Sequence, residues 1–383
     1  MSDLREPRVL SHQPAANALP LIAPNRWTSE KGQASQFPTR PHLKVRSTAR
    51  HGPGSASSHP SPSVTEIVWL PDVTRNTVDA ALHGGVTSIG NFDGVHRGHA
   101  SLLQQTRQLA DELDGPAIAC LFDPHPIALL RPDAAPKRLT TVDERARRMQ
   151  PLGIDYLLVC QTTQDLLDLS PQAFFRALLM GNLRSRGIVE GANFCFGKDR
   201  RGDVAMLRQQ CRNHDIAFRA AQMRLADGEM ISSTRIRNEL DRGRVEAAAR
   251  MMGHPHRLSG QVTHGDQRGR TLGFPTANLD DIEVVIPAPG VYAAWADTGD
   301  GRYGAAVHLG PNPTFRSGGS SKVEVHLIDY SGDLYGQTLS VDFVDRIRDV
   351  ARFESPEALT TQLTHDIRSV RQRLEQHQEH ESL

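Results

Sequence analysis

The sequence has little of what several protein classes require. Its 383 residues carry 44 basic and 44 acidic side chains and only 5% aromatic residues. We therefore expect no nucleic-acid partner, since a dedicated binder needs a broad positive surface. The four cysteines, Cys120, Cys160, Cys195 and Cys211, lie far apart without a C-x-x-C pair. This spacing argues against a disulfide framework and a structural zinc site, and favours a reducing cytoplasm.

Long apolar runs are also absent. No window approaches the roughly 20 consecutive apolar residues that a spanning helix needs, and the first residues lack the pattern of a secretory signal. We therefore expect a cytoplasmic protein with no membrane partner. Because the formal net charge is zero, any anionic ligand must be held by local groups.

Residues 1–63 differ in composition from the rest of the chain. They are rich in Pro, Ser, Ala and basic residues, and their few apolar residues follow no sustained period. This composition predicts a disordered N-terminal extension. An organelle transit peptide is an alternative, disfavoured by Asp3 and Glu6 and by the missing amphipathic pattern. A start codon assigned too early is another.

The length suits two domains, which we place at residues 64–250 and 251–383. In the first, short apolar strands alternate with amphipathic helices, which predicts a parallel, doubly wound α/β sheet. The expected strands are 85–90, 117–122, 156–159 and 187–190, with helices at 102–113, 142–152 and 171–181.

A single helix over 235–252 precedes a second pattern, in which short apolar segments are separated by Gly and Pro. These segments predict a small β-barrel. The helix that closes it begins with a Ser355 cap and continues through Leu374. The expected strands are 258–262, 284–286, 291–295, 305–309, 323–327 and 339–343.

The most informative string is Gly90-Asn-Phe-Asp-Gly-Val-His-Arg-Gly-His99. It follows a predicted strand and places His96 and His99 where a helix should begin, at the edge where an open parallel sheet binds ligands. Imidazole and backbone N–H donors there suit the phosphates of ATP. The glycines let the backbone approach a phosphate closely. The alternative is two surface histidines that cap a helix.

A second element, Ile231-Ser-Ser-Thr-Arg-Ile-Arg237, offers hydroxyls and free N–H groups at a helix start, with two arginines just inside. This arrangement also suits anions. A Ser/Thr cap on a basic helix is the plainer interpretation.

Together the two strings resemble the HxGH nucleotidylyltransferase module of the prokaryotic bifunctional riboflavin kinase/FMN adenylyltransferases, also called FAD synthetases. The resemblance implies a Rossmann-like domain that transfers AMP from ATP to FMN and releases pyrophosphate, with Mg²⁺ assistance. It implies catalytic roles for His96 and His99. Further strings, Phe122-Asp-Pro-His-Pro126 and Gly191-Ala-Asn-Phe-Cys-Phe-Gly197, match the same family. The implied nucleotide- and phosphate-binding residues are Gly90, Asn91, Phe92, Asp93, Gly94, Gly98, Asn193, Ser232, Ser233, Thr234 and Arg237; Asn193 and the loop 124–126 would line the nucleotide and flavin site.

The second half carries Gly269-Arg-Thr-Leu-Gly-Phe-Pro-Thr-Ala-Asn-Leu279. On an extended segment Thr276 and Asn278 point the same way, which suits oxygen coordination of a Mg²⁺–nucleotide. A polar turn is the alternative. Glu324 lies on the polar face of a predicted strand, where a carboxylate with few charges nearby can take a proton from a substrate hydroxyl. An exposed strand glutamate is the plainer interpretation.

These strings resemble the riboflavin kinase module of the same family. The resemblance implies that Thr276 and Asn278 bind Mg²⁺ and ATP phosphates, that Gly273 and Pro275 contact the nucleotide, and that Glu324 is the base acting on the ribityl 5′-hydroxyl. The segment 310–314 is a slightly altered version of the family's usual Gly-x-x-Pro-Thr string.

The resulting prediction is a two-step enzyme that phosphorylates riboflavin to FMN and adenylylates FMN to FAD, using ATP and Mg²⁺, as a monomer or weak homo-oligomer. One alternative is a nucleotidylyltransferase with another acceptor, which leaves the Thr276, Asn278 and Glu324 segments unexplained. A flavin-binding regulator without turnover is the other, disfavoured because the catalytic side chains are all present.

Overall fold

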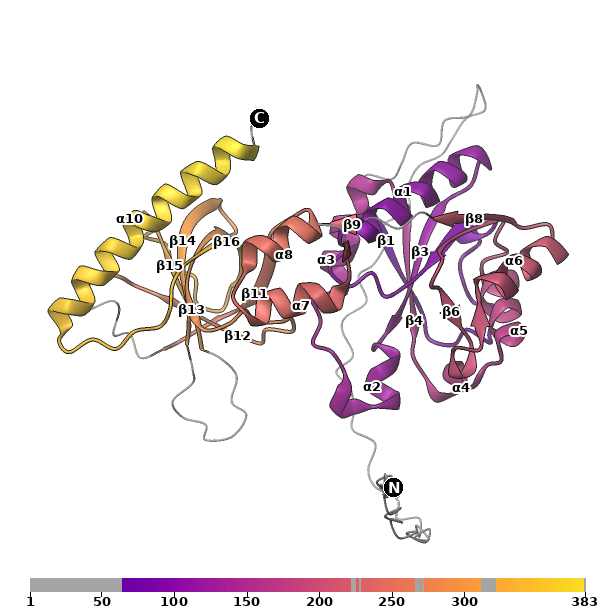
Figure 1. The fold of residues 1–383 in the computed structure, drawn as a ribbon, viewed down its shortest axis with the longest axis horizontal. Helices are drawn as coiled ribbons and strands as arrows, with labels where there is room; N and C mark the ends of the chain where they lie inside the picture. Colours follow the sequence, from indigo (N-terminus) through magenta and orange to yellow (C-terminus); the bar gives the residue numbers. More distant parts are fainter. Residues whose placement is uncertain are drawn as a thin grey trace, which may run out of the picture. The chain divides into compact units, whose positions relative to one another are not determined.

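The computed structural model describes residues 64–221, 225–226, 229–265, 269, 272–310 and 322–381. The predicted extension over 1–63, and residues 311–314 of the altered string, lie outside the described residues. The described chain folds into a parallel sheet flanked by helices, followed by a β-barrel with a long helix at its side (Figure 1). This order confirms the predicted fold class.

The first region is built on six parallel strands in the order β1-β4-β3-β2-β5-β8. Its strands are β1 (Glu66–Leu70), β2 (Val86–Ile89), β3 (Ala117–Asp123), β4 (Tyr156–Gln161), β5 (Gly187–Gly191) and β8 (Ala217–Ala221). Its helices are α1 (Arg97–Glu112), α2 (Pro126–Leu130), α3 (Val142–Met149), α4 (Gln164–Asp168), α5 (Pro171–Phe174), a π-helical turn (Phe175–Asn182) and α6 (Val204–Asn213). Two small ribbons pair β6 (Cys195–Phe196) with β7 (Gly202–Asp203) and β9 (Leu225–Ala226) with β10 (Glu229–Met230).

Helices cover both faces of this sheet. Because its central strands are buried on both sides, their sequences are nearly continuous apolar runs. In β4, the four residues from Leu157 to Cys160 are all buried. One face packs against α1 and α3, and the other against α5, the π-helical turn and α6. Strands β1 and β8, which the sequence analysis did not identify, lie at the two edges of the sheet.

The order in which successive strands are added to the sheet reverses at β2. Strands β3 and β4 follow on one side, and β5 and β8 on the other. The ladder between β2 and β5 contains only the pairs Val86 with Gly187 and Thr87 with Ile188. Beyond them the two strands separate toward their carboxyl ends. Open α/β sheets bind ligands in the crevice at such a point.

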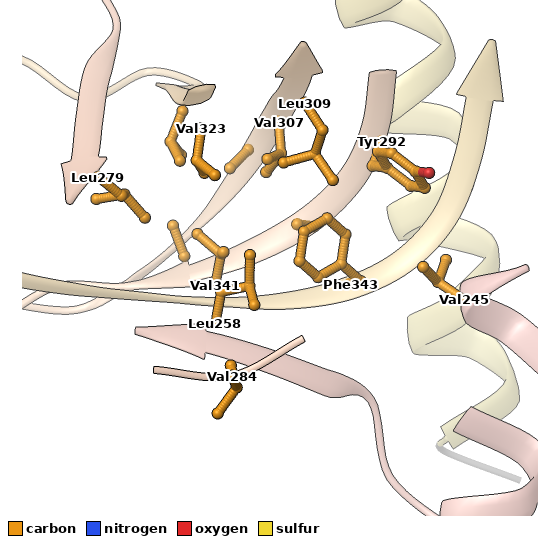
Figure 2. Close-up of a cluster of buried hydrophobic side chains, with 14 of the residues drawn as sticks. Val245, Leu258, Leu279, Val284, Tyr292, Val307, Leu309, Val323, Val341 and Phe343 are labelled. Atoms are coloured by element: carbon orange, nitrogen blue, oxygen red, sulfur yellow. The ribbon is translucent and has the colours of Figure 1, made fainter. Parts of the chain in front are cut away.

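The second region is a closed antiparallel barrel in the order β11-β12-β15-β14-β13-β16. Alternation along each strand fills its interior: in β15, Val323, Val325 and Leu327 are buried and the residues between them are not. Figure 2 shows this core, in which Phe343 lies among Leu258, Val341 and Tyr292. The strands are β11 (His256–Thr263), β12 (Ala277–Asp280), β13 (Gly290–Asp297), β14 (Arg302–Gly310), β15 (Lys322–Leu327) and β16 (Thr338–Arg348).

Two sequence predictions in this region are wrong. The helix expected over 235–252 is two helices, α7 (Ser233–Asp241) and α8 (Val245–Met252). Gly243 separates them with a φ of 74°, which a continuing helix cannot contain. The expected strand 284–286 is absent, because Val284 makes only an isolated bridge to Arg138, and β12 completes the barrel instead.

The predicted closing helix is confirmed as α10 (Pro356–Glu381). Ser355 Oγ accepts a hydrogen bond from Ala358 N at 3.2 Å, as the cap predicts. Val370 and Leu374 of α10 pack with Ala293 and Val344 on the outside of the barrel. This helix therefore covers the face formed by β13, β14 and β16.

Replacing Phe343 by alanine should lower the free energy of unfolding by about 3–5 kcal/mol, because it empties a ring-sized volume in the barrel core. Urea unfolding measures the loss. The matched control is Val350→Ala, since Val350 is 41% exposed and its truncation should change stability by less than about 0.5 kcal/mol. Equal losses in the two variants would contradict the described core.

Candidate functional site

The two histidines of the first string lie at the start of α1, as predicted. His96 is the N-cap, and its Nδ1 accepts a hydrogen bond from His99 N at 3.2 Å. The two rings stack with centroids 3.6 Å apart. Because Nδ1 of His96 is an acceptor, a neutral ring carries its proton on Nε2 and can donate it to a ligand. A Cβ at Gly98 would lie 3.1 Å from the His96 ring, so this glycine makes room for the cap.

Both imidazoles are neutral at physiological pH. Burial lowers the pKa of His96 to about 4. Burial also lowers the pKa of His99 well below its ordinary value, and the neighbouring His96 adds to the effect. Neutral rings at this position can offer an anion hydrogen-bond donors and dipoles, together with the free N–H groups of the first turn. His99 Nδ1 has no hydrogen-bond partner among the described residues.

Asp93 occupies the centre of the loop between β2 and α1. Its buried carboxylate accepts hydrogen bonds from Leu139 N and Thr140 N at 3.0–3.1 Å. It also pairs with Arg145 at 2.9 Å and with Arg237. These donors occupy its oxygens, so the structure places Asp93 in a supporting position. A direct phosphate contact, implied by the resemblance, stays a prediction.

The second string forms the start of α7, confirming the predicted Ser/Thr cap. Ser232 Oγ accepts a hydrogen bond from Arg235 N at 3.3 Å. Ser233 Oγ donates to Asp93 O at 2.9 Å, and Arg237 contacts the Asp93 carboxylate. The two strings therefore meet in the fold, although many residues separate them. Thr234 is exposed on the first turn.

The remaining residues of the first string line the same loop. Phe92 is buried with its ring 5.4 Å from that of His99, and a Cβ at Gly90 would lie 3.3 Å from the Phe92 ring. Asn91 Oδ1 is buried without a hydrogen-bond partner among the described residues. Gly94 has a φ of 84°, and a Cβ there would lie 2.9 Å from the Leu139 side chain. The unpaired Asn91 Oδ1 and His99 Nδ1 at this edge fit a polar ligand.

An aromatic cluster lies beside the ends of β3 and β5. The Phe174 ring lies 6.1 Å from that of Phe122 and 5.8 Å from that of Phe196, and Phe194 stacks on Phe196 at 5.6 Å. Asn193 is exposed in the turn that precedes these rings. The sequence analysis quoted the strings that contain them without recognising that they meet. Such rings suit the flat face of a ligand.

A separate constellation lies on the outer face of the barrel. Asn278 of β12 and His308 of β14 are both register partners of Glu324 in β15. The three side chains therefore form one row across neighbouring strands, on the face opposite Val323 and Val325. The structure thus brings Glu324 beside the predicted Thr-Asn pair. His308 was missed because it has no sequence motif of its own.

The backbone of Gly265 packs tightly against the Asn278 side chain. A Cβ at Gly265 would lie 2.1 Å from Asn278 Nδ2, so only glycine fits there. Asn278 Oδ1 is buried without a hydrogen-bond partner in the part of the chain that the structure describes. An oxygen left free in a tight cradle fits a hard cation such as Mg²⁺.

Thr276 lies one residue before β12. A Cβ at Gly269 would lie 3.5 Å from Thr276 Oγ1. His326 of β15 fixes this turn by donating from Nδ1 to Pro275 O at 2.8 Å. Gly273 is exposed with a φ of 86° and has open space where a side chain would be. The turn is therefore anchored to the strand that carries Glu324.

The expectation that few charges surround Glu324 is wrong. Lys322 Nζ lies 2.8 Å from Glu324 Oε1, and His308 Nδ1 lies 3.1 Å from Oε2. The hydrogen bond from His308, followed by the contact with Lys322, lowers the pKa of Glu324 to about 2 against the opposing effect of burial. The carboxylate is ionised and ready to accept a hydrogen bond, although it is a weak base.

Comparisons with known proteins match both regions. The model of the FAD synthetase family covers residues 78–235, and that of the riboflavin kinase family covers residues 252–374. The bifunctional riboflavin kinase/FMN adenylyltransferase of Escherichia coli strain K12 is 36% identical over 293 residues, which are 76% of this chain and 93% of the relative. The Pseudomonas fluorescens protein of the same name is 37% identical over 288 residues, 75% of this chain and 92% of the relative.

A solved structure from Streptococcus pneumoniae, described as a macrolide-efflux protein, is also similar. It covers 79% of this chain and 98% of its own, with a TM-score of 0.72 and 30% sequence identity. The likeness establishes a shared two-region fold. None of the helices in the described ranges has the length and apolar character that crossing a membrane requires.

The buried histidine at the N-cap makes stability depend on pH. Between pH 6.5 and about 4 the unfolded chain binds a proton at His96 that the folded chain does not, so stability falls as the pH falls. Asparagine keeps a cap acceptor and cannot titrate. His96→Asn should therefore reduce the slope of unfolding free energy in this range by up to about 1.4 kcal/mol per pH unit. Urea unfolding at several pH values measures it, and an unchanged slope would contradict the neutral assignment.

Proposed function

Because this chain belongs to the family of bifunctional riboflavin kinase/FMN adenylyltransferases, we propose that riboflavin is phosphorylated at the Asn278–Glu324 row and FMN is adenylylated at the His96–His99 end of α1. The enzyme uses ATP in both steps and makes FMN and then FAD. The observation that carries this assignment is that each matched family segment contains buried polar atoms without a partner among the described residues: Asn91 Oδ1 and His99 Nδ1 in the first, and Asn278 Oδ1 beside Glu324 in the second.

At the sheet edge, the triphosphate of ATP lies over the N-terminus of α1. His96, through its Nε2 proton, and Arg237 bind phosphate oxygens as charge moves onto them. An oxygen of the FMN phosphate attacks the α-phosphorus, a new P–O bond forms, and the bond to the β-phosphate breaks to release pyrophosphate. The attacking phosphate is already ionised, so no general base is required.

The flavin ring of FMN is assigned to the aromatic cluster of Phe122, Phe194 and Phe196. These rings follow β3 and β5, on the same edge of the sheet as the start of α1. Stacking against a flat isoalloxazine gives binding energy without a charged group. Asn193, in the adjoining turn, is within the same loop and would contact the polar part of the ligand.

In the barrel, Thr276 and Asn278 would hold Mg²⁺ with the phosphates of ATP. The bound ion supplies positive charge that offsets the phosphate oxygens. Glu324 accepts the proton of the ribityl 5′-hydroxyl while that oxygen bonds to the γ-phosphorus and ADP leaves. A carboxylate of low pKa suffices for this, because the attacking oxygen carries little charge in a loose transition state and gives up its proton late.

Two substitutions separate the sites. Glu324→Ala should abolish FMN formation and leave FAD formation from supplied FMN unchanged, because it removes the proton acceptor from the barrel alone. His99→Ala should do the reverse. Chromatography of the products formed from riboflavin or FMN with ATP and Mg²⁺ measures both. The unaffected activity of each variant is its control for folding, and parallel losses of both activities would contradict two independent sites.

Asn278→Ala should raise the Mg²⁺ concentration needed for half-maximal riboflavin phosphorylation by about tenfold or more, since an amide oxygen ligand is lost. Asn278→Asp keeps an oxygen at this position and is the matched control. The Mg²⁺ dependence of FMN adenylylation should not move in either variant. An unchanged requirement for phosphorylation in Asn278→Ala would remove Asn278 from the metal site.

A further inference from the structure

Glu190 differs from the other buried acidic side chains in the described residues. Each of the others pairs with an arginine: Asp93 with Arg145, Asp155 with Arg107, Asp342 with Arg257 and Asp366 with Arg348. Glu190 is 1% exposed and contacts no basic side chain in the same ranges. Its hydrogen-bond donors are backbone amides, Ile89 N at 2.5 Å from Oε1 and its neighbour Gly191 N.

The position of this carboxyl is the point where β2 and β5 separate. Their ladder ends at Thr87 and Ile188, and a continued register would place Ile89 opposite Glu190. Ile89 N receives no ladder partner there, and the Glu190 side chain takes the place of the missing carbonyl. One carboxyl group thus connects β5 to β2 at the edge where open α/β sheets bind ligands.

The surroundings favour the uncharged form of this group. Ile89, Cys120 and Ile188 belong to the apolar cluster on this side of the sheet. Burial raises the pKa of Glu190 well above its ordinary value, against the opposing effect of the hydrogen bonds from the backbone of Ile89 and Gly191. The Cys120 thiol is the titratable side chain that interacts with it. An ionised carboxylate here would lack a countercharge, whereas a neutral acid is tolerated.

The two ends of the bridge lead directly into the loops assigned to ATP and FMN. Ile89 is followed by Gly90 and Asn91 at the start of the histidine loop, and Gly191 is followed by the turn that contains Asn193. We propose that Glu190 is a positioning residue for adenylyl transfer: its carboxyl group, bonded to Ile89 N where the ladder between β2 and β5 ends, fixes the spacing between these two loops. This inference rests on the proposed function of the sheet edge.

Glu190→Gln and Glu190→Leu test the proposal together. Glutamine keeps a neutral acceptor of the same reach, so FMN adenylylation at pH 7 should stay within about threefold of the wild type. Leucine keeps most of the volume but leaves Ile89 N unpaired, and kcat/KM for FMN adenylylation should fall by about tenfold or more. Riboflavin phosphorylation in the same samples should be unchanged in both variants.

Ile188→Val is the matched control for general weakening of β5, since it shortens a buried side chain two residues earlier on the same strand. It should lower thermal stability and leave kcat/KM for FMN adenylylation within about twofold of the wild type. Leucine at position 190 with wild-type adenylylation, or glutamine with the same loss as leucine, would overturn the positioning role.

A direct readout of protonation completes the test. The infrared difference spectrum of the wild type minus Glu190→Gln at pH 7 should contain the C=O band of a buried carboxylic acid. A carboxylate band in its place would overturn the neutral assignment. Failure of the wild type to convert FMN to FAD would instead refute the proposed function, so the two failures are distinguishable.

Discussion

The Asp93 carboxylate is the contact on which the adenylyl-transfer end of the sheet depends. It accepts hydrogen bonds from the backbone after residue 138 and pairs with Arg145 and Arg237. These partners come from two segments far apart in the chain, 139–145 and α7. Removing one member of a buried ion pair costs about 3–5 kcal/mol because the remaining charge is left without a partner. The loop that carries His96 therefore has a fixed geometry before any nucleotide arrives.

In the barrel, the register of the paired strands holds the polar side chains in place. Asn278, Glu324 and His308 share a row because β12, β15 and β14 pair in one alignment. A shift of one residue would turn Glu324 into the core and Val323 out of it. The buried valines of β15 therefore keep the polar row outside, so packing in the interior determines the geometry of the chemistry on the surface.

The sequence alone was enough to predict the fold class, and the strings it singled out come together in the fold at the two candidate sites. Strong apolar runs identified β3, β4 and β5, and fixed glycine and histidine spacings identified the loop before α1. Edge strand β8 was missed because Arg219 interrupts its short apolar segment, whereas β1 was missed although residues 67–70 form a continuous apolar run. The break between α7 and α8 was missed because Gly243 lies in an otherwise helical pattern.

Pairings between distant residues could not be predicted in this way. Nothing in the sequence near Glu324 predicts that His308 is its neighbour, whereas the alternation along β15 does place Lys322 on the same face. Likewise, Asp93 lies in a string that suggests phosphate binding, and only the folded chain shows that arginines already occupy its oxygens. Local patterns specify elements, whereas the environment of a charge depends on which elements become neighbours.

Helix α7 contacts both the loop before α1 and the hydrophobic core of the barrel. Its Arg237 side chain contacts Asp93, while Ile236 and Leu240 pack into the cluster that fills the barrel. The FAD synthetase match ends at residue 235, inside this helix. A fragment cut at that boundary would lose the arginine and the apolar anchor together. The two catalytic regions are therefore joined by shared packing, and division of the chain into autonomous halves would damage the nucleotide loop.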